Sequence, residues 1–144
     1  MFRNPILTAY IEAFEQLTPE SLPQLGELFS DAVYFKDPFN AVKGRHATLK
    51  VFEHMFATTQ SPTFIIIDAA MVDNIALLYW KFYFVLPSNK SKQMIEGMSR
   101  VRFDENGLVN EHIDHWDATE QVYSKVPILS WFIMKIQKRL SASN

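Results

Sequence analysis

The sequence contains no cysteine among its 144 residues. Disulfide bonds, thiolate metal sites and a cysteine nucleophile are therefore excluded, while the redox compartment is left open. The chain also lacks an excess of positive charge, since 14 Lys and Arg stand against 16 Asp and Glu and no dense basic run occurs. This composition offers no basic surface for a nucleic acid, so we expect no nucleic-acid partner.

Long apolar runs are missing as well. No stretch of about 18 uncharged apolar residues occurs, so no membrane span is expected. The first segment, MFRNPILTAYIEAFEQL, lacks the long apolar core and the small-residue cleavage site of a signal peptide. We therefore expect a cytoplasmic protein that folds as one domain over residues 1–144, because a chain of this length closes a single core.

Aromatic residues, in contrast, are abundant. The chain has 12 Phe, 5 Tyr and 3 Trp, within a hydrophobic content of 48%. Rings in this number favour a core with deep aromatic walls, which is also what an apolar cavity requires. A small apolar ligand is therefore the expected binding partner.

Helical periodicity occurs in the first part of the chain and at its end. We predict helices from Pro5 to Leu17, over a short stretch after Thr18, and from Arg45 to Thr58. Asn4 and Pro5 suit the cap and first residue of the first helix. A further amphipathic helix is predicted over residues 127–140. It either covers the core or a cavity, or lies on a membrane surface.

Between these helices the pattern is that of extended chain. A brief strand over residues 32–36 stops at Asp37-Pro38, because proline cannot continue a ladder. Asn106-Gly107 supplies the left-handed backbone that a tight hairpin needs. The longer strands are expected at residues 63–72, 75–86, 93–103 and 108–116. The predicted arrangement is of the α+β class, because helices come first, a curved antiparallel sheet follows and a further helix closes the chain.

The strands indicate what each face of the sheet contacts. In residues 75–86 every even position is apolar, whereas Tyr79, Lys81 and Tyr83 mark the other face. This alternation favours a sheet that packs helices inside and meets a partner outside. If Ser99 faces inward, then Met98 lies on the outer face and adds to a surface on which a homodimer would form.

Several short motifs carry a family resemblance. They are DPF at residues 37–39, Gly44 before the third helix, RFDENG at 102–107 and Trp116-Asp117. Over about residues 5 to 120 the chain resembles a nuclear-transport-factor-2-like domain, of the kind shared by ketosteroid isomerases and SnoaL-like polyketide cyclases. The resemblance implies a cone-shaped sheet around the helices, a ligand cavity at the open end and frequent dimers through the outer sheet face.

The resemblance also implies a role for Asp37. This residue falls on the position of the isomerases' general base, which moves a proton between substrate carbons. The oxyanion hole of those enzymes, however, is not matched, since Ser99 stands at its aspartic acid and Phe14 near its tyrosine. A developing oxyanion needs preorganised donors. True ketosteroid isomerase activity is therefore not expected.

A second candidate group lies on the last strand, where alternation puts His112, Asp114 and Trp116 on one face. The carboxylate of Asp114 can orient the imidazole of His112 and raise its basicity. SnoaL-like cyclases resemble this, with acid–base His and Asp residues in the same region. The alternative is that the two side chains only satisfy one another within a bent sheet.

Asp37 has an alternative reading too, because aspartate before proline commonly opens a turn by accepting hydrogen bonds from backbone amides. Apolar neighbours would instead raise its pKa and favour acid–base work. We expect Asp37, His112 and Asp114 as catalytic candidates. The predicted lining of the cavity is Tyr10, Phe14, Tyr34, Phe39, Phe52, Ser99 and Trp116.

No metal site or cofactor is expected, since no HxxxH or HxH motif occurs and His112 and His115 point to opposite faces. Two hypotheses remain. The first is an enzyme that performs cofactor-independent acid–base chemistry, of an isomerase, cyclase or hydratase type, on a small apolar carbonyl or polyketide-like compound. The second is a non-catalytic domain for ligand binding or dimeric regulation.

Overall fold

A computed structural model describes residues 4–118 of the chain. Helix α1 spans Pro5–Glu15, and the side-chain oxygen of Asn4 caps it by accepting hydrogen bonds from the amides of Ile6 and Leu7 at 2.9 and 3.2 Å. The predicted cap and first residue of this helix are therefore confirmed. The buried residues Leu7, Tyr10, Ile11 and Phe14 form the side that packs on the sheet.

Two further helical segments precede the sheet and one interrupts it. The 3-10 turn η1 covers Pro19–Ser21, and α2 follows directly over Leu22–Glu27. Helix α3 spans Arg45–Thr58, the range that the sequence predicts. Its first residue follows Gly44, whose φ of 103° lies in the region that favours glycine.

The strands form one six-stranded sheet in the order β2-β1-β6-β5-β4-β3, so that β2 and β3 are its edges. Four of the five strand pairings are antiparallel, whereas β1 and β6 are parallel. The sheet is therefore mixed rather than purely antiparallel. The strands are β1 Phe29–Lys36, β2 Ala41–Lys43, β3 Gln60–Val72, β4 Ile75–Val85, β5 Lys92–Phe103 and β6 Val109–His115.

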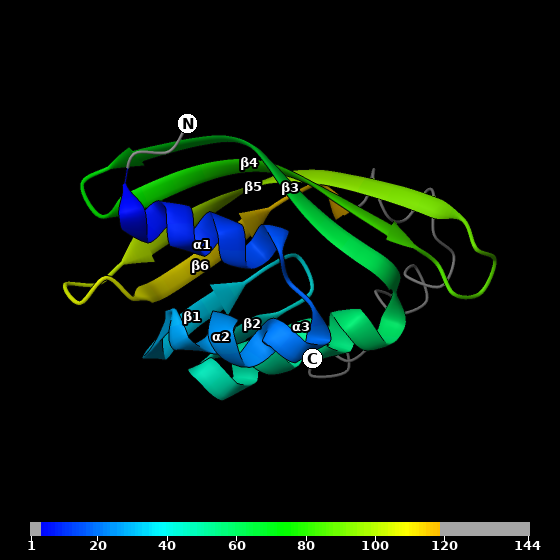
Figure 1. Cartoon of the computed structure of the whole chain (residues 1–144), viewed down its shortest axis with the longest axis horizontal. Helices are drawn as coiled ribbons and strands as arrows, with labels where there is room; N and C mark the ends of the chain where they lie inside the picture. Colours follow the sequence, from blue (N-terminus) through cyan, green and yellow to red (C-terminus); the bar gives the residue numbers. More distant parts are fainter. Residues whose placement is uncertain (1–3, 119–144) are drawn as a thin grey trace, which may run out of the picture.

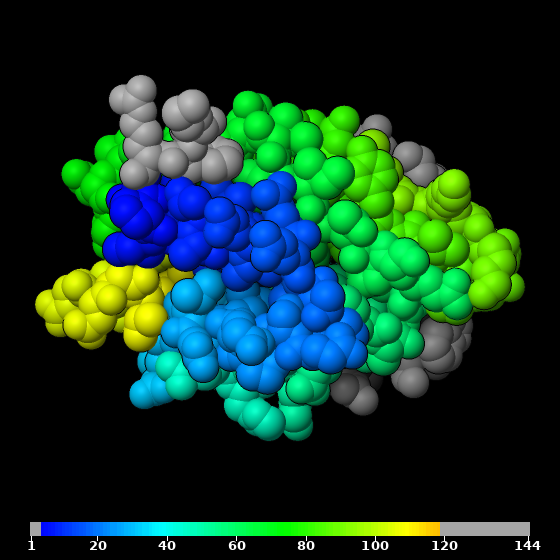
Figure 2. Space-filling model, in the orientation of Figure 1, coloured from blue at the N-terminus to red at the C-terminus, as the bar shows by residue number. Residues whose placement is uncertain are grey.

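The sheet curves around the helices without closing (Figure 1). Helix α1 lies against the long strands, and α2 and α3 lie beside β1 and β2 (Figure 1). Figure 2 shows the face on which α1 and α2 lie side by side. A core of buried apolar side chains fills the space between α1, α2 and the sheet, with Tyr10, Phe29 and Phe35 among the largest. The predicted α+β fold with a strongly curved sheet is confirmed.

Several details differ from the sequence prediction. Strand β2 has three residues and was not predicted. Only Gly107 of the Asn106-Gly107 pair has a positive φ, of 80°, and the amides of Asn106 and Leu108 donate to the carboxylate of Asp104. The predicted helix over 127–140 lies outside the described residues. Within residues 4–118, no helix is long and apolar enough to cross a membrane.

Candidate functional site

A hollow of about 1060 Å³ lies between α3 and the concave face of the sheet. Its wall is mostly apolar, because β3, β4 and β5 contribute Phe64, Phe82 and Ile95 among others. A second hollow of about 470 Å³ adjoins the first. Asp37, Asp114 and Trp116 line both, so the two hollows meet at these side chains.

Asp37 lies in the turn between β1 and β2, and this turn holds its carboxylate firmly. The Oδ1 atom accepts hydrogen bonds from the amides of Phe39 and Asn40, at 2.8 and 2.7 Å. The side-chain amide of Asn40 donates to both carboxylate oxygens, at 3.1 and 3.2 Å. Asp37 therefore does what a turn-opening aspartate does, and it also lines the hollow.

The environment of Asp37 changes its acidity. Burial raises the pKa of the Asp37 carboxyl above its ordinary value, and the negative charge of Asp114 raises it further. The hydrogen bonds from Phe39 and Asn40 lower the pKa, but they do not outweigh the burial. A carboxyl group of this kind retains its proton closer to neutral pH and can exchange it with a bound molecule.

The second acidic group is held by a buried histidine. The Nε2 atom of His112 lies 2.7 Å from Oδ1 of Asp114, and the phenolic oxygen of Tyr10 lies 2.6 Å from Nδ1 of the same imidazole. His112 and Tyr10 are 4% and 1% exposed. Strand β6 therefore presents Asp114 to the hollow with His112 and α1 behind it.

Two residues on the neighbouring strands extend this network. The hydroxyl of Ser99 donates to Oδ1 of Asp114, and the indole Nε1 of Trp80 donates to Ser99 Oγ at 2.7 Å. Ser99 is 3% exposed. The indole packs over Gly97, where an added Cβ would lie 2.7 Å from its ring atoms. Glycine at this position thus leaves the space that Trp80 needs.

The hydrogen atoms of this network can be assigned from its donors. Burial, together with the charge of Asp114, raises the pKa of Tyr10 well above its ordinary value, so the phenol keeps its proton and donates to Nδ1. His112 then carries its hydrogen on Nε2 and donates to Asp114. Asp114 Oδ1 accepts from both His112 and Ser99, and Asp114 also lines the hollow.

The structure brings together only part of the predicted site. Among the predicted residues, the larger hollow is lined by Asp37, Phe39, Phe52, Asp114 and Trp116. The ring of Phe39 lies edge-on to that of Trp116, with centroids 5.2 Å apart. These five residues come from the turn after β1, from α3 and from the end of β6.

The other predicted residues do not line the hollow. Tyr10, Phe14, His112 and Ser99 are buried behind it. Tyr34 alternates with the buried Phe35 along β1 and so lies on the opposite face of the sheet. Ser99 is therefore linked to Asp114 directly and Tyr10 is linked to it through His112, and neither side chain lines this hollow.

Sequence reasoning missed several residues of the site. Asn40 holds Asp37, and Trp80 holds Ser99. The spacing Asp-x-x-Asn after a short strand could have indicated the contact between Asn40 and Asp37, because an aspartate side chain reaches amides two and three residues ahead. The contact between Trp80 and Ser99 depends on the pairing of β4 with β5, which no local pattern reveals. Within residues 4–118 no group of three or more His, Asp or Glu side chains is arranged to hold a metal ion.

Comparisons with known proteins place this geometry in a family. Residues 7–112 match the SnoaL-like domain. No curated protein sequence matches the chain significantly. Similar solved structures include a protein of ketosteroid isomerase-like fold from Catenulispora acidiphila, in complex with trimethylamine. It shares 14% identity at a TM-score of 0.72, over 85% of this chain and 92% of that one.

Two other similar structures are candidate polyketide cyclases. The SnoaL-like one from Shewanella denitrificans has 15% identity and a TM-score of 0.67, over 83% of this chain and 96% of that chain. The one from Xanthomonas campestris has 12% identity and a TM-score of 0.68, over 82% and 92%. At these identities the likeness shows the fold, and the matched residues 7–112 show the family. The chain is a member of the SnoaL-like domain family, within the nuclear-transport-factor-2-like fold.

Proposed function

We propose that the larger hollow binds a small apolar molecule and that Asp37 exchanges a proton with it, without a cofactor. The observation that carries this proposal is the position of Asp37, which lines an apolar hollow of about 1060 Å³ with a pKa raised by burial and by Asp114. A volume of this order accommodates a small organic molecule. The substrate class is an apolar carbonyl or polyketide-like compound.

Each acidic residue has a distinct role in this proposal. Asp37 takes a proton from a carbon next to a carbonyl group and returns it elsewhere, which is acid–base catalysis by one carboxyl group. Asp114, which also lines the hollow, acts as the second acid–base group. His112 positions Asp114 from behind, because its imidazole is enclosed by Tyr10, Phe14 and Phe35.

One observation favours a non-catalytic alternative. An enol intermediate needs donors at its oxygen, and the hydroxyl of Ser99 is already engaged by Trp80 and Asp114. Phe14, at the other expected donor position, provides none. Under this alternative the hollow holds a ligand without transforming it.

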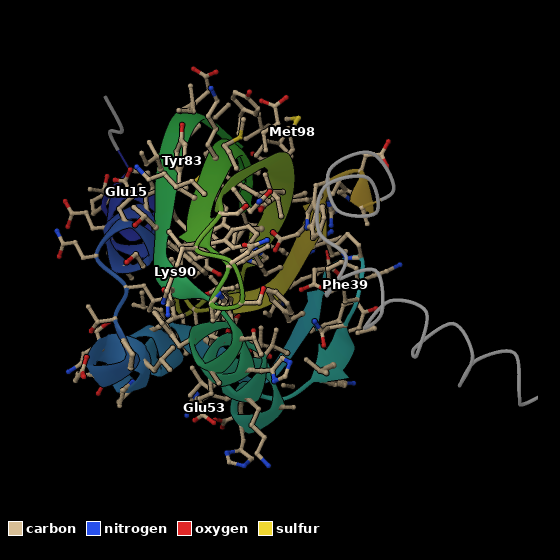
Figure 3. All side chains as sticks on the ribbon, turned by 90° about the vertical axis from the view of Figure 1, so that its right-hand side faces the viewer. Glu15, Phe39, Glu53, Tyr83, Lys90 and Met98 are labelled. Atoms are coloured by element: carbon tan, nitrogen blue, oxygen red, sulfur yellow. The ribbon has the colours of Figure 1, made fainter. Side chains whose placement is uncertain are left out.

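The outer face of the sheet supports a second proposal, a homodimer. Exposed apolar side chains project from β3, β4 and β5 on the side away from the core; they are Ile65, Ile67, Leu77, Tyr83, Met94 and Met98. Tyr83 and Met98 lie across the sheet from α3 (Figure 3). An apolar, Met- and Tyr-containing surface of this kind is typical of an interface core. We propose that it pairs with the same surface of a second copy.

Hydrogen exchange on an apolar ketone tests the acid–base proposal. With 2-tetralone in D₂O, the wild-type protein is expected to speed deuterium incorporation next to the carbonyl group, as followed by NMR. Asp37→Asn is expected to lower this rate by about 100-fold or more, because loss of a positioned base has effects of that order. Glu53→Gln, on the exposed surface of α3, is the control and keeps the wild-type rate. Equal rates for wild type and Asp37→Asn would exclude Asp37 as the base.

A further inference from the structure

The larger hollow contains two copies of one local arrangement, an acid followed two residues later by an aromatic ring. Asp37 and Phe39 come from the turn between β1 and β2, and Asp114 and Trp116 from the end of β6. All four side chains line the hollow, and the two rings meet edge to face at 5.2 Å. Figure 3 shows Phe39 beside β1 and β2. Two carboxylates and two rings are thus gathered at one place.

Neither carboxylate has a lysine or arginine partner in the part of the chain that the structure describes. Asp37 accepts hydrogen bonds from neutral amides, and Asp114 from His112 and Ser99. The arginine ion pairs of residues 4–118 lie elsewhere, on Asp31 and Glu111. Within residues 4–118, Asp37 and Asp114 therefore form an acidic pair that no lysine or arginine side chain neutralises by an ion pair.

Two lysines lie in the walls of the two hollows. Lys50 lines the larger one from α3, Lys36 lines the adjoining one, and both residues are exposed to solvent. Asp114, by contrast, has a side chain only 17% exposed. Apolar groups that cover Asp37 and Asp114 remove water from these carboxyl groups without replacing its hydrogen bonds, which is unfavourable.

A cationic amine removes this difficulty. Its N–H groups donate to carboxylate oxygens, and its charge is attracted to the faces of aromatic rings. We propose that the hollow selects an apolar molecule bearing a protonated amine, with the ammonium group at Asp37, Asp114, Phe39 and Trp116. The apolar body lies against the ring-lined wall formed by Phe64, Phe82 and Phe84. This inference rests on the proposed function in one respect, that the hollow binds a small molecule.

Two probes of equal shape test the selection. 1-Aminoadamantane is cationic at pH 7, and 1-adamantanol has the same cage with a neutral hydroxyl group. Their affinities are measured by titration of the full chain, followed by ¹⁵N NMR at low salt. The amine is expected to bind about tenfold more tightly or better, since charge-assisted hydrogen bonds from an ammonium group to Asp37 and Asp114 contribute on the order of that factor.

Variants test whether Asp37 and Asp114 cause the preference for the amine over the alcohol. Asp37→Asn combined with Asp114→Asn is expected to bring the two affinities within about threefold of each other, since only neutral acceptors then remain. Glu53→Gln removes a charge from the outer surface of α3 and is expected to keep the full preference (Figure 3). Should the double variant not fold, Phe39→Leu keeps the apolar volume and is expected to weaken amine binding more than alcohol binding.

The outcomes separate this inference from the proposed function. If the wild-type protein binds the alcohol as tightly as the amine, selection of an ammonium group is refuted while ligand binding stands. The same holds if the preference survives in the folded double variant. If neither probe binds, the inference and the proposed ligand site both fail. A preference that is lost with Asp37 and Asp114 but kept in Glu53→Gln supports the inference.

Discussion

At the scale of single residues, the hydroxyl of Tyr10 is the feature with the clearest consequence for stability. It supplies the hydrogen bond to Nδ1 of His112, and both groups are buried. Tyr10→Phe leaves that nitrogen without a donor, so the free energy of unfolding is expected to fall by about 1–3 kcal/mol. Denaturant unfolding followed by circular dichroism measures the change.

Tyr34→Phe is a matched control. It removes the same hydroxyl oxygen from a side chain that lies on the face of β1 away from the core. Tyr34→Phe is expected to change stability by no more than about 0.5 kcal/mol. Equal stabilities for the two variants would mean that the pair formed by Tyr10 and His112 contributes nothing.

The sequence identified some of these residues and not their connections. Asp37 was found through the DPF motif, and His112, Asp114 and Trp116 through strand alternation. The bond from Tyr10 to His112 joins residues 102 positions apart, so no local pattern could predict it. The sequence left the direction of Ser99 open; its side chain is buried, and Trp80 on the adjacent strand donates to its hydroxyl.

At the scale of elements, hydrophobic periodicity and the positions of Gly, Pro and other turn residues were sufficient to predict most helices and strands. Helix α3 ends at Thr58, β3 ends at Val72 and β4 begins at Ile75, as predicted. Strand β2 was not predicted, because three residues are too few to show a hydrophobic period. The parallel pairing of β1 with β6 was not predicted either, because it joins segments far apart in the sequence. Such pairings depend on how the whole sheet closes around its core.

The outer face of β5 carries the prediction that belongs to this scale. Met98 is 49% exposed on β5, an inner strand of the sheet, and it belongs to the proposed dimer surface. Met98→Glu is expected to weaken a homodimer about tenfold or more, because it places a charge where like surfaces meet. Sedimentation equilibrium measures the monomer–dimer constant.

Ile6→Glu, which puts the same charge on the exposed side of α1, is expected to leave that constant unchanged. A wild-type protein that stays monomeric at about 100 μM would argue against the interface. So would a Met98→Glu variant that dimerises like the wild type.

At the scale of the whole molecule, the sheet brings the two acidic residues of the candidate site together. The turn after β1 and the end of β6 are 77 residues apart between Asp37 and Asp114, and the parallel pairing of β1 with β6 sets them side by side. The charge of Asp114 consequently raises the pKa of Asp37. The proposed acid–base chemistry depends on Asp37 and Asp114 lining the same apolar hollow.

The most direct test is a ¹³C NMR titration of the Asp37 carboxyl group in the wild-type protein and in Asp114→Asn. We expect a wild-type pKa above the ordinary value of 3.8, because burial disfavours the charged form. Asp114→Asn is expected to lower the pKa of Asp37, because the variant removes a neighbouring negative charge. A pKa at or below 3.8 that does not respond to Asp114→Asn would contradict the account.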